Sequence, residues 1–407
     1  MNWPNSSISH RVHRTKWEWL KIFGPGILVM LADTDAGSVV TAAQSGAKYG
    51  NAFVLPDIFL IVVLYLVQEM TVRMGLATGQ GQGALIRKYF GVNWARAVVL
   101  ILYINCVGAL VTEYAGIATV GQLAGISKWW FVPMTLVILV AAAFLGKYRR
   151  VERMGIMLGL LEIVFIPAAI WEVFHGPQSV SSLWNLPLGQ THFAWMVAAN
   201  VGAVLMPWMI FFQQQAVHDS KMGVRHLKLA RRDTLFGAIL TQSVMIAVMM
   251  TAAAVFPRHM TLTSMSSLAL TLVPLLGRGG VIIFAAGLLG ASMVAALVVS
   301  LAGSWAMAEV FDWKHSLNSR FQDTPTFHMV YALSHVIAVC IVLTTTAYVS
   351  ISIAVEVMNA AILPAVLVFL IMLEYRALPR AWRMSKNRRI LIVILSALAV
   401  LSGLLTL

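Results

Sequence analysis

The chain has 407 residues, of which 59% are hydrophobic and only 11% are charged. This composition excludes an ordinary soluble domain and indicates a membrane protein. The net charge of +13 would suggest nucleic-acid binding in a soluble chain, but here we attribute it to membrane orientation and expect no nucleic acid. Cys106 and Cys340 lie inside apolar runs, so they predict neither a disulfide framework nor a zinc site.

Apolar runs divide the chain into membrane-spanning segments. A helix that crosses a bilayer needs about 20 predominantly apolar residues. Eleven segments satisfy this rule: Leu20–Thr41, Phe53–Arg73, Trp94–Leu123, Trp130–Leu145, Met154–Phe174, Phe193–Gln214, Thr234–Phe256, Gly280–Ala308, His328–Thr346, Ile351–Leu373 and Ile390–Leu405. We therefore expect an all-α membrane protein with a single transmembrane domain over residues 1–407. The basic N-terminus lacks the apolar stretch of a signal peptide, so the first spanning helix is expected to direct insertion.

The basic residues predict the orientation, because cytoplasmic loops carry an excess of Lys and Arg. With a cytoplasmic N-terminus, most of these residues gather in the loops expected inside, at 11–21, 73–96, 147–153, 221–232, 314–320 and 376–389. Only Lys48, Lys128, Arg258 and Arg278 fall on the opposite side. Adding or removing one span would destroy this alternation. The charge pattern thus supports eleven spans in a plasma membrane, with the C-terminus outside.

The stretch from Gly24 to Tyr49 predicts a spanning helix that is interrupted in its middle. Apolar residues at 27–31 are followed by Asp33 and Asp35, and helical character resumes at Val39. An ionisable side chain at mid-bilayer depth is costly and usually faces a cavity or an ion path. Unwound backbone is tolerated at that depth only where it lines such a cavity. The two aspartates therefore indicate a cation site.

The sixth segment, around Ala198 to Val217, predicts a second interruption. Gly202 precedes Pro207, which lacks a backbone donor and clashes with the preceding turn of a helix. Broken helices in the first and sixth segments are typical of two inverted repeats of five helices, whose half-helix ends meet near the midplane. We expect the repeats at about 20–175 and 193–373, and an extra helix at about 390–405. Carbonyl groups freed at the breaks would point at a cation.

Short motifs accompany both interruptions. They read GP at 24–25, DAGS at 35–38, GAKYG at 46–50 and MPW at 206–208. In order and spacing these motifs resemble the natural resistance-associated macrophage protein family of divalent metal transporters, and weaker similarity covers 227–256 and 272–289. The resemblance implies the LeuT-like inverted-repeat fold with broken helices one and six. It also implies divalent metal uptake, which in this family is usually driven by protons.

The resemblance assigns metal-binding roles to individual residues. Asp35 falls on the family's metal-binding aspartate and Met206 on its metal-binding methionine. Ala32 and Ala203 fall on positions whose backbone carbonyls help to bind the metal. Ser38 replaces the family's asparagine ligand and offers a hydroxyl instead. A methionine in an apolar helix usually only packs, but a thioether at a break would favour Mn²⁺, Fe²⁺, Co²⁺ or Cd²⁺ over Mg²⁺ and Ca²⁺.

Five further residues are candidates for an additional site or a proton path. Glu113 falls on a third-helix acid that the family links to proton movement, and Glu356 falls near a tenth-helix glutamine that can join the site. Asp33 is an added carboxylate, Trp208 replaces a histidine, and Gln213 stands where a second histidine is common. Other departures from the family pattern are Ala36 in place of a proline and Gly116 in place of an acid.

We interpret the chain as a secondary active transporter of divalent metal ions that works by alternating access. It has no nucleotide-binding loop and no nucleophile or zinc motif of an enzyme. We expect no cofactor, with the metal as substrate, the bilayer as surroundings and a monomer as the working unit. Retained Met206 favours Mn²⁺ or Fe²⁺, with proton symport left open. The alternatives are an uncoupled Mg²⁺ transporter, a membrane sensor that only binds metal, and a carrier of organic substrates.

Overall fold

A computed structural model describes residues 25–145, 157, 160–175, 191–220, 222–257, 259–315 and 321–394. Within these residues all regular structure is helical, as predicted. The start of the first predicted segment and most of the eleventh lie outside the described residues, and the fifth is covered only in part. Eight helical stretches of the described chain are long and apolar enough to cross a membrane.

The described residues form α-helices and short 3-10 helices (η). They are α1 (Pro25–Asp33), α2 (Ala36–Tyr49), η1 (Gly50–Phe53), α3 (Val54–Thr78), α4 (Gln82–Phe90), α5 (Val92–Leu123), α6 (Lys128–Leu145), η2 (Leu160–Val164), α8 (Phe165–His175), α9 (Thr191–Val204), α10 (Pro207–Asp219), η4 (Val224–His226), α11 (Leu227–Val255), η5 (Met265–Leu272), α12 (Val273–Leu276), α13 (Arg278–Phe311), η6 (Phe321–Asp323), α14 (Pro325–Thr344), α15 (Tyr348–Ala377) and η7 (Arg380–Trp382).

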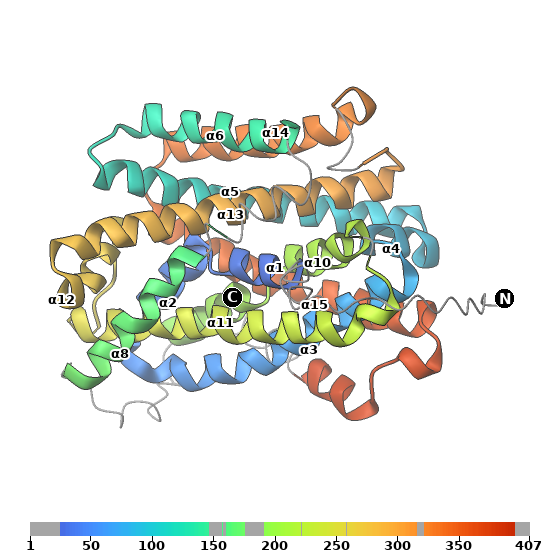
Figure 1. Cartoon of the computed structure of the whole chain (residues 1–407), viewed down its shortest axis with the longest axis horizontal. Helices are drawn as coiled ribbons and strands as arrows, with labels where there is room; N and C mark the ends of the chain where they lie inside the picture. The colour runs from blue at the N-terminus through green and yellow to red at the C-terminus, as the bar shows by residue number, and fades with distance from the viewer. Residues whose placement is uncertain are drawn as a thin grey trace, which may run out of the picture.

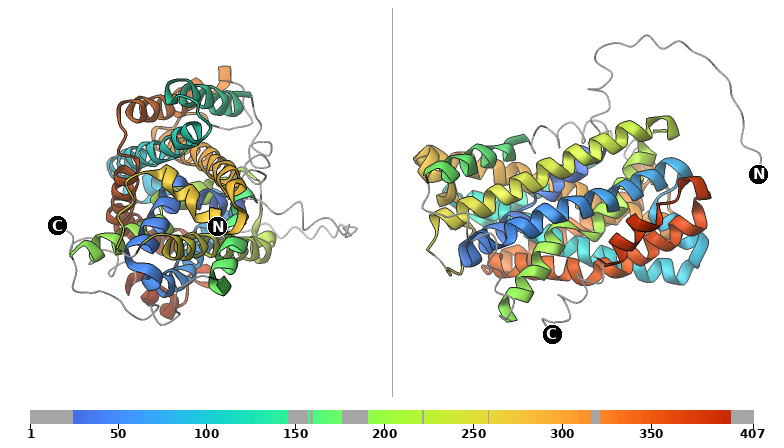
Figure 2. Two further views of the ribbon diagram at one scale, coloured as in Figure 1. Left: turned by 90° about the vertical axis from the view of Figure 1, so that its left-hand side faces the viewer. Right: turned by 90° about the horizontal axis from the view of Figure 1, so that it is seen from below.

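The half-helices α1 and α10 lie at the centre of the molecule (Figure 1). On one side α5 packs along α13, and α6 with α14 forms the outermost layer beyond them; on the other side lie α11 and α3, which run side by side in Figure 2 (right). Side chains from 36 to 47 in α2 and from 207 to 217 in α10 are all buried. The central half-helices are therefore shielded from lipid on every face, which allows them to carry polar residues.

Both predicted interruptions are present. The first is narrower than expected, because Asp33 is still helical and α2 begins at Ala36 rather than at Val39. The second lies at Leu205 and Met206, directly before Pro207, and α9 continues through Gly202 to Val204. Proline suits the first position of α10, where an N–H would have no helical partner.

Two segments were not predicted. The short helix α4 packs on α5 and α13, and its start is held by Glu309, whose Oε2 accepts a hydrogen bond of 3.2 Å from the Ala84 N–H. The η5–α12 segment covers the opposite end of α13. Neither has the length of a membrane span, so a search for runs of about 20 apolar residues passes over both.

Basic residues of the described chain gather at one end of the helices. They lie at the end of α3, along α4, at the start of α11 and after α15, the right-hand end in Figure 1. Lys48, Lys128 and Arg278 lie toward the opposite end. The alternation of charge along the chain is thus matched by the arrangement of the helices, and the assignment of the basic end to the cytoplasm stays a prediction.

Candidate transport site

The first break is organised by Asp35, which is fully buried and caps the N-terminus of α2. Its Oδ1 accepts a hydrogen bond of 2.7 Å from the Ser38 N–H. Its Oδ2 is buried and has no hydrogen-bond partner in the described part of the chain. Asp35 therefore retains one carboxylate oxygen that capping does not use.

The carbonyl of Ala32 is released from helical hydrogen bonding at the same break. In a continuous helix it would accept from the N–H of residue 36. That N–H instead donates to Glu113 Oε2 on α5, at 3.2 Å. The acid of the third predicted span thus maintains the interruption of the first, in addition to any part in proton movement.

The second break releases the carbonyl of Ala203 by a different route. Its helical donor would be the N–H of residue 207, and Pro207 has none. The Ser38 hydroxyl donates to this carbonyl at 3.1 Å and so joins the two breaks directly. Met206 is the N-cap of α10, and its sulfur accepts a hydrogen bond of 3.0 Å from the indole N–H of Trp208.

Glu356 on α15 lies against both broken helices. A methyl group at Gly37 would collide with its carboxylate, and one at Gly202 would collide with its backbone carbonyl. Its Oε2 accepts from the Asn359 side chain at 2.7 Å, and Asn359 Oδ1 in turn accepts from Asn105 on α5 at 2.6 Å. The sequence analysis noted the two glycines only as parts of the interruptions and did not predict the two asparagines, because only the approach of α15 gives these residues their contacts with Glu356.

The remaining predicted residues surround the break to different degrees. Asp33 Oδ2 accepts from Gln242 on α11 at 3.3 Å, while its Oδ1 has no partner among the described residues. Trp208 is fully buried beside Met206. Gln213 lies further along α10 and donates to the Thr234 hydroxyl at 3.0 Å, so it faces α11.

The four predicted acids Asp33, Asp35, Glu113 and Glu356 thus lie around one break, and Glu162 of η2 also interacts electrostatically with Asp33 and Asp35. Asp33 and Glu113 each interact electrostatically with both Asp35 and Glu356. Within the described chain no three His, Cys, Asp or Glu side chains converge at metal-ligand distance. A metal held here would therefore need ligands of other kinds, and the freed carbonyls, the thioether and the hydroxyl are such groups.

Two broken helices that meet inside an all-helical, multi-pass membrane protein define the LeuT-like fold. Solved structures with this fold include the Eremococcus coleocola manganese transporter in complex with an aromatic bis-isothiourea substituted compound, with a TM-score of 0.79 and 16% identity, covering 99% of this chain and 89% of that one. MhsT in complex with L-phenylalanine has a TM-score of 0.64 and 14% identity, covering 98% and 99%.

The family model for natural resistance-associated macrophage protein-like chains matches residues 26–407, so this chain belongs to that family. The predicted resemblance is thereby confirmed. Two similar relatives carry the name divalent metal cation transporter MntH. The protein of Pectobacterium carotovorum is 25% identical over 320 residues, covering 75% of this chain and 76% of the relative. That of Chromohalobacter salexigens is 26% identical over 321 residues, covering 74% and 73%.

Proposed function

We propose that the protein is a secondary transporter that carries divalent metal ions across the plasma membrane by alternating access. The observation that carries the proposal is the release of the Ala32 and Ala203 carbonyls at two breaks that meet beside the free Oδ2 of Asp35. Carbonyl and carboxylate oxygens are ordinary ligands of divalent ions. The names of the relatives, divalent metal cation transporter, support the same substrate class.

In this proposal Asp35 supplies the charge that offsets partial dehydration of the ion. Met206 and the two carbonyls complete the shell with Ser38. Since the Ser38 hydroxyl now donates to Ala203, the arriving ion replaces that hydrogen bond and pulls the two breaks together. An interior-negative potential of about 100 mV favours inward movement by about 2.3 kcal/mol per charge.

The metal that we propose is Mn²⁺ or Fe²⁺, because Met206 offers a soft sulfur at the break. Uncoupled transport of Mg²⁺ is the second candidate. The observation that favours it is the gathering of Asp33, Glu113 and Glu356 around Asp35, since a hard ion prefers oxygen ligands and retains its waters.

We also propose proton symport, with Asp35 and Glu113 as the carriers. One carboxylate oxygen of Glu113 accepts a hydrogen bond from the Ala36 N–H, and the other accepts one of 3.0 Å from the Thr112 hydroxyl. A change in its protonation therefore acts directly on the backbone of the first break. Simultaneous recording of internal pH and Mn²⁺ uptake tests this point, and metal uptake without acidification contradicts symport.

The decisive experiment is Mn²⁺ uptake into proteoliposomes that carry an interior-negative potential. Uptake by the native protein is expected to saturate, and Asp35→Ala is expected to lower it at least tenfold. The matched control is Asp57→Asn, which changes an equally buried acid in the first turn of α3. Uptake no greater than in empty vesicles, for Mn²⁺ and Mg²⁺ alike, would refute the proposal.

A further inference from the structure

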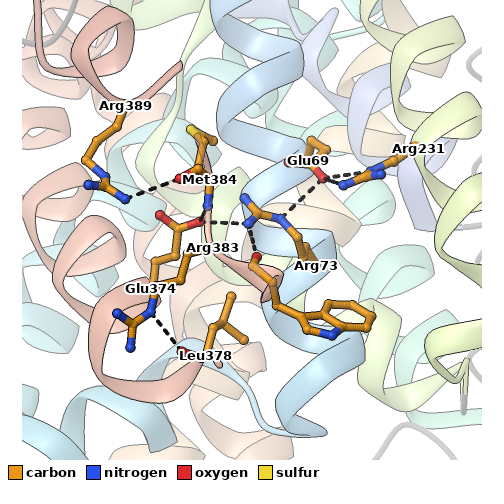
Figure 3. A network of polar contacts seen from close by, with 9 residues as sticks. Glu69, Arg73, Arg231, Glu374, Leu378, Arg383, Met384 and Arg389 are labelled. Atoms are coloured by element: carbon orange, nitrogen blue, oxygen red, sulfur yellow. Dashed lines mark hydrogen bonds and ion pairs between the residues drawn. The ribbon is translucent and has the colours of Figure 1, made fainter. Parts of the chain in front are cut away.

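A second charged cavity lies at the basic end of the helices, away from the breaks. Its volume is about 410 Å³, and it lies between α3, the start of α11 and the segment that follows α15. Among the described residues, Glu69 is the single acid that lines it. Four arginines also line it: Arg73, Arg231, Arg383 and Arg388. We call it the arginine cavity, and Figure 3 shows most of its charged groups.

Ion pairs in the cavity wall neutralise only part of this positive charge. Glu69 Oε1 lies 3.3 Å from Arg73 Nε and 2.6 Å from Arg231 Nη2, so one carboxylate serves two arginines. Glu374 on α15 lies 2.7 Å from Arg73 Nη1. The four guanidinium groups thus face two carboxylates, and the cavity keeps an excess of positive charge.

The Arg73 side chain, which lines the cavity, also has a hydrogen-bond donor without an acceptor among the described residues. This side chain is only 4% exposed. Its Nη1 donates to Glu374 and to the Trp382 carbonyl, but its Nη2 has no hydrogen-bond partner among the residues that the structure describes. A buried guanidinium with a free N–H is costly unless an acceptor reaches it. The cavity offers the space for such an acceptor.

Exposed apolar side chains lie close to the cavity on α11 and α15. One turn along α11 from Arg231 the exposed side chains become apolar, at Leu235, Phe236 and Ile239. On α15, Met372 and Tyr375 are exposed shortly before the helix ends. An anion bound in the cavity would therefore have apolar surface directly beside it, as the acyl chains of a phospholipid require.

We propose that the arginine cavity binds the phosphate headgroup of an anionic phospholipid. Guanidinium groups bind phosphate through paired, charge-assisted hydrogen bonds. Basic cavities between membrane helices are suited to anionic headgroups. Arg231 and Arg388 contact the headgroup at the mouth, and Arg73 Nη2 meets it deeper inside. The proposal is independent of the metal site, because no residue is shared between them.

The test is a lipid titration of the full-length protein in detergent, read by native mass spectrometry and by the thermal unfolding midpoint. Phosphatidylglycerol is expected to bind and to raise the midpoint, whereas phosphatidylcholine is not. Each arginine near an anionic headgroup is worth about 1 kcal/mol. Arg388→Gln is therefore expected to weaken binding about fivefold, and Arg231→Gln with Arg388→Gln about 30-fold.

Lys386→Gln is the matched control, because it removes the same charge from the same segment but lies outside the cavity wall. Since Arg388 is exposed, its single variant remains informative if the double variant unfolds. Phosphatidylglycerol binding that is equal in Arg388→Gln and Lys386→Gln would overturn the proposal. An equal rise of the midpoint with inorganic phosphate alone would also overturn it, because the occupant would then be a soluble anion.

Discussion

Ser38 is a residue through which the two breaks contact each other directly. Its N–H donates to Asp35 and its hydroxyl donates to the Ala203 carbonyl. A hydroxyl is shorter than the carboxamide found at this position in the family pattern, so it holds the second break close to the first. One small residue therefore positions the carboxylate of the proposed shell through its backbone and a carbonyl of that shell through its side chain.

At the residue scale, Met206→Ala separates the two candidate metals. Loss of the thioether is expected to weaken Mn²⁺ transport about tenfold, equivalent to about 1.4 kcal/mol, and to leave Mg²⁺ transport unchanged. Competition of Mg²⁺ against Mn²⁺ uptake measures the difference. Met209→Ala is the control, because Met209 is equally buried one turn later and forms the same kind of packing void. Equal losses in both variants would make Met206 a packing residue.

Gly37 supports a second prediction at this scale. The added methyl group of Gly37→Ala collides with the Glu356 carboxylate, so we expect apparent stability to fall by about 1–3 kcal/mol and transport to be lost. Shortening the acid in Gly37→Ala with Glu356→Ser should restore stability but not full transport. Gly223→Ala, where an added methyl group meets no neighbour within 4 Å, is the control. An unchanged thermal midpoint in Gly37→Ala would contradict the contact.

The candidate site was predictable from sequence only in part. Asp35 and Met206 were found because a charge at bilayer depth and a residue next to a proline are visible in the sequence itself. The contacts of Gly37 and Asn359 with Glu356 were not predicted, because they depend on where α15 lies relative to both breaks. The position of an element 300 residues away cannot be derived from local pattern or spacing.

At the scale of elements, each break releases a backbone carbonyl from helical hydrogen bonding, but the two breaks do so by different means. Between α9 and α10 the proline removes a donor from the chain, whereas between α1 and α2 the donor is present but is held by Glu113. The first break is thus reversible by a change at one side chain, and the second is fixed in the backbone. The second break was easily predicted from the sequence. For the first break, helix was predicted to resume at Val39, which is three residues later than the observed start of α2.

Pro207→Ala tests whether the released carbonyl is needed. Alanine restores an N–H that can donate to the Ala203 carbonyl and compete with Ser38. We expect Mn²⁺ uptake to fall at least tenfold, while the thermal midpoint stays equal or rises because α9 and α10 can join. Pro133→Ala, within α6 of the outermost layer, is the control. Native transport by Pro207→Ala would show that this carbonyl does not take part.

At the scale of the whole molecule, one ionic network joins three helices. Arg73 lies on α3 and Glu374 on α15, and Arg231 on α11 extends the network through Glu69. The distribution of charge along the sequence indicated which end would be basic. It did not indicate the pairs Arg73–Glu374 and Arg231–Glu69, because each joins residues that lie far apart in the chain and meet only after the helices have packed.

A double-mutant cycle on Arg73 and Glu374 measures how strongly the packing of α3 against α15 depends on this network. Both side chains are almost fully buried, and removing Glu374 leaves Arg73 only the Glu69 carboxylate that it shares with Arg231, so the change should cost about 3–5 kcal/mol. Glu374→Gln alone should therefore lower the thermal midpoint more than Arg73→Met with Glu374→Gln does. The control cycle is the exposed pair Arg87–Asp312, also an ion pair between helix ends, where screening should limit the coupling to at most about 1 kcal/mol. Equal coupling in the two cycles would mean that the buried pair is hydrated, and that apolar packing alone holds α3 and α15 together at this end.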